Sequence, residues 1–142
     1  MNRLNGFVRA VQISGAVALA DVDVDGDTLS ALVVETDLLS THLQPGTRVL
    51  VLFQETEVSL AKNLSGLISM RNRLPARIKT LARGEVLTRV TLDYRGQTLV
   101  AIITTRSAER LALAVDDNVE ALIKANEVSL IAADNAPLEV CS

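Results

Sequence analysis

Glu57-Val58-Ser59-Leu60 recurs as Glu127-Val128-Ser129-Leu130, 70 positions further along a chain of 142 residues. Two other pairs of matching segments share this offset: Asn2-Arg3-Leu4 with Asn72-Arg73-Leu74, and Thr28-Leu29-Ser30-Ala31 with Thr98-Leu99-Val100-Ala101. Chance can produce one match, but several matches at a single offset indicate an internal repeat. The sequence therefore predicts two copies of one module, residues 1–65 and 66–133, followed by a tail at 134–142.

Alternation of apolar and polar residues in the second copy predicts β-strands. Strands are expected at 77–81, 86–92, 98–104, 119–124 and 127–131, and a helix of about two turns is expected at 107–113. Val86, Thr88, Val90 and Leu92 fall on one face of their strand, and a glycine-containing hairpin follows at 93–96.

The order β-β-β-α-β-β predicts a small five-stranded barrel of the oligonucleotide-binding (OB) type, closed so that its edges are hidden. The first copy repeats this order, with its hairpin turn at Asp25-Gly26-Asp27. The expected fold class is all-β with one short helix per module, in two tandem OB-fold-like five-stranded barrels. A module of about 65 residues is marginal alone, and either strands shared between modules or the assembly of several chains would remedy this. For this reason we expect an oligomer.

Composition restricts the class of function. Apolar residues make up 49% of the chain but aromatic residues only 2%, which argues against a stacking platform for sugars or single-stranded nucleic acid. A net charge of −3 argues against a surface that tracks phosphates. The single cysteine, Cys141, favours a reducing compartment. The sequence also lacks a signal-like or membrane-length apolar run. Together these features predict a soluble cytoplasmic protein without contact with the membrane.

Catalytic and cation-binding signatures are missing from the sequence. It holds no phosphate-binding loop, no Cys-x-x-Cys pair and no cluster of ligating residues at metal spacing, so neither a cofactor nor a metal site is expected. The one histidine, His42, is isolated in the expected first helix, which favours a structural or surface role. We therefore expect a binding protein and no enzyme.

Small polar and cationic residues gather at the ends of the expected elements in the second copy. They form three segments: Ser69-Met70-Arg71-Asn72, Thr104-Thr105-Arg106-Ser107 and Lys124-Ala125-Asn126. Hydroxyl groups and backbone N–H groups at a helix start donate hydrogen bonds to anions, and one or two cations match a small tetrahedral dianion. Taken singly, each residue also fits a helix cap or a surface position, so this pattern by itself leaves both interpretations open.

The first copy differs at these positions. It has Val34 where the second has Thr104, Glu35 for Thr105, Asp37 for Ser107 and Gln54 for Lys124. Two carboxylates and the loss of the lysine oppose a bound dianion. An oxyanion site of this kind is therefore expected of the second copy, with the first copy as a structural partner.

The second copy resembles the molbindin (Mop or TOBE) modules. The resemblance runs through Ser69-Met70-Arg71-Asn72, Gly84-Glu85-Val86, Ile103 to Ala108 and Leu122 to Val128, with Met70 in place of the usual alanine. It implies an OB-type fold and molybdate or tungstate bound at interfaces between modules. The ligand residues it implies are Ser69, Arg71, Thr104, Ser107, Lys124 and the backbone of Ala125. The tandem arrangement is similar to di-domain molbindins, and a homo-oligomer, with a trimer as the implied order, would follow.

Three functions are compatible with this resemblance. The first is intracellular binding of molybdate or tungstate for storage, homeostasis or sensing. The second is the ligand-sensing or oligomerisation module of a molybdate-responsive transcription regulator or of the ATPase of a molybdate importer. The third is an oligomerisation scaffold with a degenerate site. No helix-turn-helix with a basic recognition helix is visible, so nucleic-acid binding by these residues is not expected.

Overall fold

A computed structural model of the chain describes residues 1–34 and 43–133. Over these two ranges it contains ten β-strands, one short α-helix, α2 (Thr105–Arg110), and two 3-10 helices, η1 (Glu55–Glu57) and η2 (Ala125–Glu127). The strands of the first half are β1 (Asn2–Ser14), β2 (Val17–Val24), β3 (Asp27–Val34), β4 (Arg48–Phe53) and β5 (Ser59–Ala61). Those of the second half are β6 (Asn72–Arg83), β7 (Leu87–Tyr94), β8 (Gln97–Thr104), β9 (Asn118–Ile123) and β10 (Ser129–Ala132). The all-β class and the two five-stranded units are confirmed. His42, Glu35, Asp37, Cys141 and the tail at 134–142 lie outside the described residues.

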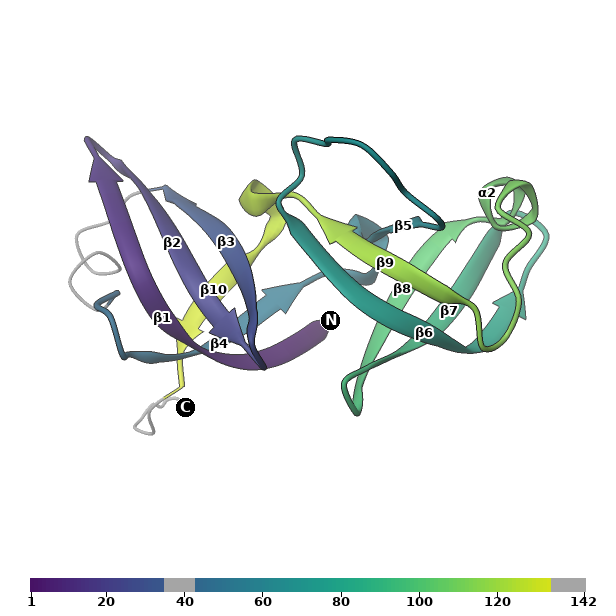
Figure 1. Ribbon diagram of the computed structural model, residues 1–142, viewed down its shortest axis with the longest axis horizontal. Helices are drawn as coiled ribbons and strands as arrows, with labels where there is room; N and C mark the ends of the chain where they lie inside the picture. The colour runs from purple at the N-terminus through teal and green to yellow at the C-terminus, as the bar shows by residue number, and fades with distance from the viewer. Residues whose placement is uncertain (35–42, 134–142) are drawn as a thin grey trace.

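The strands form two curled five-stranded sheets, and every pairing in them is antiparallel (Figure 1). The first sheet has the order β10-β4-β1-β2-β3 and the second has the order β5-β9-β6-β7-β8. Each sheet therefore takes four strands from one half of the chain and its fifth from the other half. Figure 1 shows this exchange most plainly at β10, which lies among the strands of the first half. Of the two remedies for a marginal module, the structure shows shared strands.

The exchanged strands are the repeated Glu-Val-Ser-Leu segments. Leu130 of β10 pairs with Val51 of β4, and Leu60 of β5 pairs with Ala121 of β9. The limits 1–65 and 66–133 thus describe the repeat in the sequence, whereas each sheet combines residues from both ranges. Because the sheets exchange strands, neither half can complete its own sheet from its own residues.

Lys62 anchors the segment that follows the exchanged strand β5. Its Nζ donates hydrogen bonds to the carbonyl oxygens of Leu111 and Ala112, at 3.1 and 2.9 Å, and to the carboxylate of Asp117 at 3.0 Å. The hydrogen bond from Lys62 is the main cause that lowers the pKa of Asp117, so this carboxyl is ionised near neutral pH. This contact fastens the first half of the chain to the loop that follows α2.

Both hairpin turns have the sequence chemistry that their geometry requires. Asp25 and Gly26 have φ of 50° and 94°, and Arg95 and Gly96 have φ of 49° and 88°. Positive φ at both central residues is the pattern of a type I′ turn, which matches the twist of antiparallel strands. The hairpins predicted at these two places are confirmed.

The alternation predicted for residues 86–92 is correct from Thr88 onward but fails at Val86. Thr88, Val90 and Leu92 are fully buried, as their shared face predicts. Val86 is 71% exposed, because it belongs to the turn that precedes β7 and its carbonyl accepts a hydrogen bond from Thr105 N–H.

The predicted helix at 107–113 is wrong in its limits. α2 begins at Thr105, because the side chain of Thr104 accepts the Ser107 N–H and so occupies the N-cap position. It ends at Arg110, and Ala112 adopts a positive φ of 51°, which a continuing helix does not allow. The helix therefore has only six residues.

Two buried asparagines join the halves of the chain. The side chain of Asn72 accepts a hydrogen bond from Ser30 N–H at 2.7 Å and donates one to the Ser30 carbonyl at 2.9 Å. Asn2 makes the same pair of bonds with Val100, both at 2.8 Å. Each amide side chain thus satisfies the outward-facing backbone of an edge strand, β3 or β8, that belongs to the other half.

Tyr94 links the two hairpins at their turns. Its hydroxyl donates to the Asp27 carboxylate at 2.7 Å and also lies 3.1 Å from the Val24 carbonyl oxygen. Arg95 Nε pairs with the same Asp27 carboxylate at 3.1 Å. Desolvation, followed by the hydrogen bond to Asp27, raises the pKa of the Tyr94 hydroxyl above its usual value.

This raised pKa predicts a loss of stability in alkaline solution. The fold favours the neutral phenol, so the stabilisation is complete below about pH 10, the ordinary pKa of tyrosine, and is lost as the pH rises further. The chain contains one tyrosine and no tryptophan, so an absorbance titration of tyrosinate reads Tyr94 directly. We expect Tyr94→Phe to remove part of the alkaline decline in urea denaturation. Parallel declines of the wild type and the variant would contradict this assignment.

Candidate functional site

Two of the six predicted ligand residues lie together where β8 meets α2. Thr104 Oγ1 accepts a hydrogen bond from Ser107 N–H at 3.1 Å and donates one to Ser107 Oγ at 2.9 Å. Both side chains are exposed. The paired hydroxyls therefore face solvent at a capped helix start.

The other four predicted residues lie in the two segments that precede β6 and follow β9. Asn72 pairs with Ile123 in the β6–β9 ladder, so Arg71 and Lys124 are the next residues on two neighbouring chain segments. Ser69, Arg71 and Lys124 are exposed, and the half-buried Ala125 is the first residue of η2. This group contributes two cations, a hydroxyl and backbone N–H groups.

The structure does not bring these two groups together within one chain. η2, which follows Lys124, packs against β3 of the first half, whereas β8, which ends at Thr104, packs against η1. Each group therefore faces a first-half segment that lacks the matching residue. Val34 at the end of β3 stands where the second half has Thr104, and Gln54 before η1 stands where it has Lys124. Within one chain, each of the two groups therefore faces a first-half residue that has lost the hydroxyl or the lysine.

Glu55 is an acidic residue of η1, the segment that packs against β8. It is the first residue of η1 and the counterpart of Ala125, and its carboxylate accepts a hydrogen bond from the ammonium group of Met1. This hydrogen bond is the main cause that lowers the pKa of Glu55, so the carboxylate is charged near neutral pH. Within one chain, the η1 segment therefore offers Thr104 and Ser107 no lysine, and its acidic residue Glu55 is paired with the Met1 ammonium group.

A cleft of about 560 Å³ opens beside Thr104 and Ser107. Arg110 contributes a cation to its rim, and η1 and β5 contribute Thr56 and Ser59 from the first half. Its other lining residues are aliphatic: Val58, Leu60, Leu87, Ile102, Ile103 and Leu111. The cleft combines hydroxyl donors with an apolar floor.

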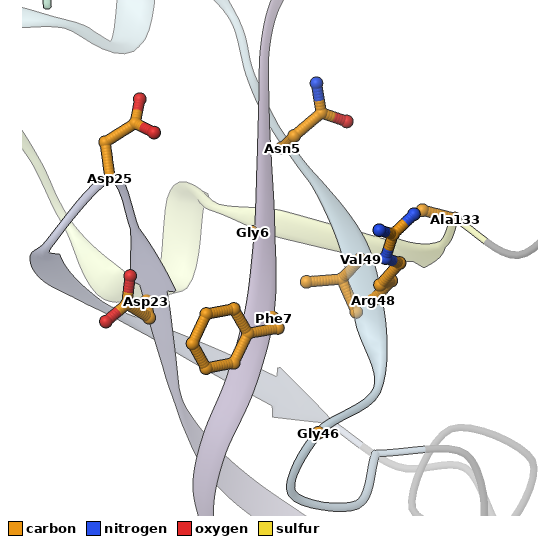
Figure 2. Close-up of a pocket in the computed structure, with 9 residues that line it drawn as sticks. All are labelled: Asn5, Gly6, Phe7, Asp23, Asp25, Gly46, Arg48, Val49 and Ala133. Carbon is orange, nitrogen blue, oxygen red and sulfur yellow. The ribbon is translucent and has the colours of Figure 1, made fainter.

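A second cleft, of about 760 Å³, lies on the first sheet and holds none of the six residues (Figure 2). In Figure 2, Asp23 and Asp25 lie on one side of Phe7 and Arg48 on the other. Two carboxylates at this cleft disfavour an anion. Within residues 1–34 and 43–133, no group of three or more His, Cys, Asp or Glu side chains is placed to hold a metal ion.

Sequence reasoning assigned no role to Asn72 or Thr88. Asn72 belongs to the repeated Asn-Arg-Leu triplet, and its presence in both copies was the signal that could have revealed its contact with the other half. Thr88 looked like an ordinary strand residue, although its counterpart in the first copy is Ala18. Its hydrogen bond to Thr105 at 2.9 Å becomes visible only in three dimensions.

Comparison with known proteins supports the relationship that the motifs indicate. The TOBE domain family matches residues 68–130. ModG, a cytoplasmic molybdate-binding protein whose crystal structure contains molybdate, superimposes with a TM-score of 0.85 and 30% sequence identity. The match covers 91% of this chain and 94% of ModG. The chain belongs to the molbindin (Mop/TOBE) family. The match to ModG extends over both halves of the chain.

Two further molbindin relatives are longer proteins. The molybdenum import ATP-binding protein ModC of Brucella abortus is 35% identical over 111 residues, which are 78% of this chain and 29% of ModC. The molybdenum-pterin-binding protein MopA of Rhodobacter capsulatus is 35% identical over 108 residues, which are 75% of this chain and 41% of MopA. The chain therefore spans less than half the length of these relatives.

Among residues 1–34 and 43–133, the structure has no helix whose length and apolar character would suit a membrane crossing.

Proposed function

We propose that the chain binds molybdate, and tungstate as its close analogue, in the cytoplasm for storage, homeostasis or sensing of the oxyanion. The observation that carries this proposal is the match to ModG, whose crystal structure contains molybdate. The match covers 94% of the length of ModG. The chain also keeps the hydroxyl, lysine and arginine side chains that a tetrahedral dianion requires. The site residues suit binding, and the proposed activity involves no catalytic step.

A complete site in this proposal needs two copies of the chain. One copy supplies Ser69, Arg71, Lys124 and the backbone of Ala125, and the other supplies Thr104 and Ser107. The reason is geometric, because within one chain these groups face Val34 and Gln54 instead of each other. A homo-oligomer would therefore be the binding form.

The two cations explain why a dianion would be preferred to neutral ligands. Lys124 and Arg71 balance the charge of the oxyanion, and the Ser107 hydroxyl and backbone N–H groups donate to its remaining oxygens. Hydrogen bonds between charged partners contribute about 1.5–3 kcal/mol each, more than neutral ones. Because sulfate has the same charge and shape, selectivity over sulfate would have to come from the size of the assembled cavity.

Removal of the lysine charge should weaken binding strongly. We expect Lys124→Ala to raise the dissociation constant for molybdate about 10- to 100-fold, as the loss of one charged hydrogen bond implies. Isothermal titration with molybdate, tungstate and sulfate measures this effect. Lys79→Ala, which removes the same charge from an exposed position on β6, is the matched control and should leave the affinity unchanged. Absence of saturable molybdate binding by the wild type would refute the proposed function.

A mixing experiment tests whether two copies share one site. Lys124→Ala and Ser107→Ala should each bind molybdate weakly as pure oligomers. When the two variants are co-expressed, mixed oligomers contain some sites in which both Lys124 and Ser107 are intact, so high-affinity binding should reappear. If both residues served a site within one chain, co-expression would restore nothing.

The second candidate is a sensing or oligomerisation module of a larger protein. It is favoured by the match to ModC, and by the match to the molybdenum transport protein ModE of Herbaspirillum seropedicae, 33% identical over 114 residues. Sequencing the gene upstream of the Met1 codon distinguishes the candidates. An in-frame ATPase or DNA-binding segment would favour the larger protein, and a stop codon would favour a free binding protein.

A further inference from the structure

Thr88 is one of four buried polar side chains in the described part of the chain, together with Asn2, Ser30 and Asn72. Asn2 and Asn72 hydrogen-bond across the two halves, and Ser30 hydrogen-bonds to Asp21 on the neighbouring strand. Thr88 instead reaches Thr105, the first residue of α2, with 2.9 Å between their hydroxyl oxygens. A buried hydroxyl is costly unless it is paired, and the hydrogen bond to Thr105 offsets this cost for Thr88.

The direction of this hydrogen bond follows from the partners of Thr105. Thr105 Oγ1 donates its only proton to the Gly84 carbonyl oxygen at 2.8 Å. It must therefore accept from Thr88, which gives a chain of hydroxyls that runs from Thr88 through Thr105 to Gly84. Thr105 N–H also donates to the Val86 carbonyl at 2.8 Å. These bonds fasten the start of α2 to the turn between β6 and β7.

The turn that receives these bonds is closed by a hydrogen bond of its own. Gly84 N–H donates to the Leu87 carbonyl at 2.8 Å. A Cβ at position 84 would lie 2.7 Å from the Leu87 carbonyl oxygen, so a larger residue would displace the backbone. The helix start is thus held against a turn whose own conformation is narrowly determined.

The fastened residue lies between the two predicted hydroxyl ligands. Thr104 Oγ1 accepts from Ser107 N–H and donates to Ser107 Oγ, so its proton is already used. The hydroxyl proton of Ser107 is the one left to donate to a ligand. The orientation of Ser107 therefore depends on the position of residues 104–107, which the Thr88–Thr105–Gly84 chain holds.

We propose that Thr88 is a positioning residue for the oxyanion site, acting through Thr105 to hold Ser107 as the direct hydroxyl donor. The inference rests on the proposed function, because it assigns Ser107 to the oxyanion. Comparison of the two copies supports it. The first copy has Ala18 for Thr88 and Glu35 for Thr105, and it also lacks the hydroxyls that correspond to Thr104 and Ser107. The first copy thus lacks both the positioning hydroxyls of Thr88 and Thr105 and the ligand hydroxyls of Thr104 and Ser107.

The test compares Thr88→Val, which keeps the shape but removes the hydroxyl, with Thr88→Ser, which keeps the hydroxyl. By analogy with the groups that orient metal ligands, we expect Thr88→Val to weaken molybdate binding about tenfold. Thr88→Ser should bind as the wild type does. Thr98→Val removes an exposed hydroxyl from β8 and should leave the affinity unchanged. Tyr94→Phe, which disturbs the distant hairpin contact, controls for a general loss of stability and should also leave the affinity unchanged.

Hydrogen exchange in the unliganded protein gives a readout that does not depend on binding. Thr88→Val should speed exchange of the Thr105 and Ser107 amides and leave those of β9 unchanged. The inference is overturned if Thr88→Val binds molybdate as the wild type does, if Thr88→Ser weakens binding as much as Thr88→Val, or if exchange at these amides does not change. If the wild type fails to bind molybdate, the proposed function falls as well, so the two failures are distinguishable.

Discussion

Replacement of Asn72 by leucine is expected to lower the free energy of unfolding by about 2–5 kcal/mol. The amide side chain is fully buried and makes two hydrogen bonds with the backbone of Ser30, at 2.7 and 2.9 Å. Leucine has a similar size but leaves the Ser30 N–H and carbonyl without partners. Each unsatisfied buried group costs about 1–3 kcal/mol. Urea denaturation followed by far-UV circular dichroism measures the loss.

Asn118→Leu is the matched control for this prediction. Asn118 is exposed on β9, so the same change of side chain should alter the free energy of unfolding by less than about 0.5 kcal/mol. Asn2→Leu should resemble Asn72→Leu, because Asn2 is buried and makes the equivalent pair of bonds with Val100. Equal effects of Asn72→Leu and Asn118→Leu would show that the bonds between the halves contribute nothing to stability.

Leu130→Ala is expected to destabilise the protein by about 2–4 kcal/mol, with the local effect in the sheet of the first half. Leu130 comes from the second half of the sequence, but it lies in β10, is 7% exposed and pairs with Val51 of β4. Removal of its side chain leaves a cavity beside strands of the first half. Chemical denaturation measures the total loss, and hydrogen exchange locates it.

The hydrogen-exchange pattern distinguishes strand exchange from a simple tandem arrangement. With exchange, amides of β4 and β1 should lose protection in Leu130→Ala more than those of β9 and β6. Ile131→Ala on the same strand is the control, because Ile131 is 47% exposed and should cost far less. Loss of protection centred on β9 would mean that β10 belongs to the sheet of the second half.

Much of the fold was predictable because it depends on local patterns. The alternation of Thr88, Val90 and Leu92 predicted a strand with one buried face, and the turn residues predicted two hairpins, whose type I′ geometry the structure adds. The limits of α2 were less predictable, because the capping hydrogen bond of Thr104 competes with the apolar pattern of 107–113. The repeat itself followed from residue identity alone.

The candidate site was predictable in its residues but not in its arrangement. Ser69, Arg71, Thr104, Ser107, Lys124 and Ala125 were identified as a set from residue type, position and family resemblance, and their role remains a prediction. That set divides into two groups in space because η2 lies against β3 and η1 lies against β8. Such packing joins residues far apart in the sequence, and no local pattern encodes it.

Residue identities alone establish that this protein is a tandem repeat of small β modules whose second copy has the hydroxyls and cations suited to an oxyanion. Which half completes which sheet depends instead on packing between distant parts of the chain. Glu57-Val58-Ser59-Leu60 and Glu127-Val128-Ser129-Leu130 are identical, so each segment fits either sheet equally well by its own side chains. The choice depends on how the chain crosses from β4 to β5 and from β9 to β10, and on the contacts of Lys62, Asn2 and Asn72 between the halves. That choice also turns Lys124 away from Ser107 of its own chain.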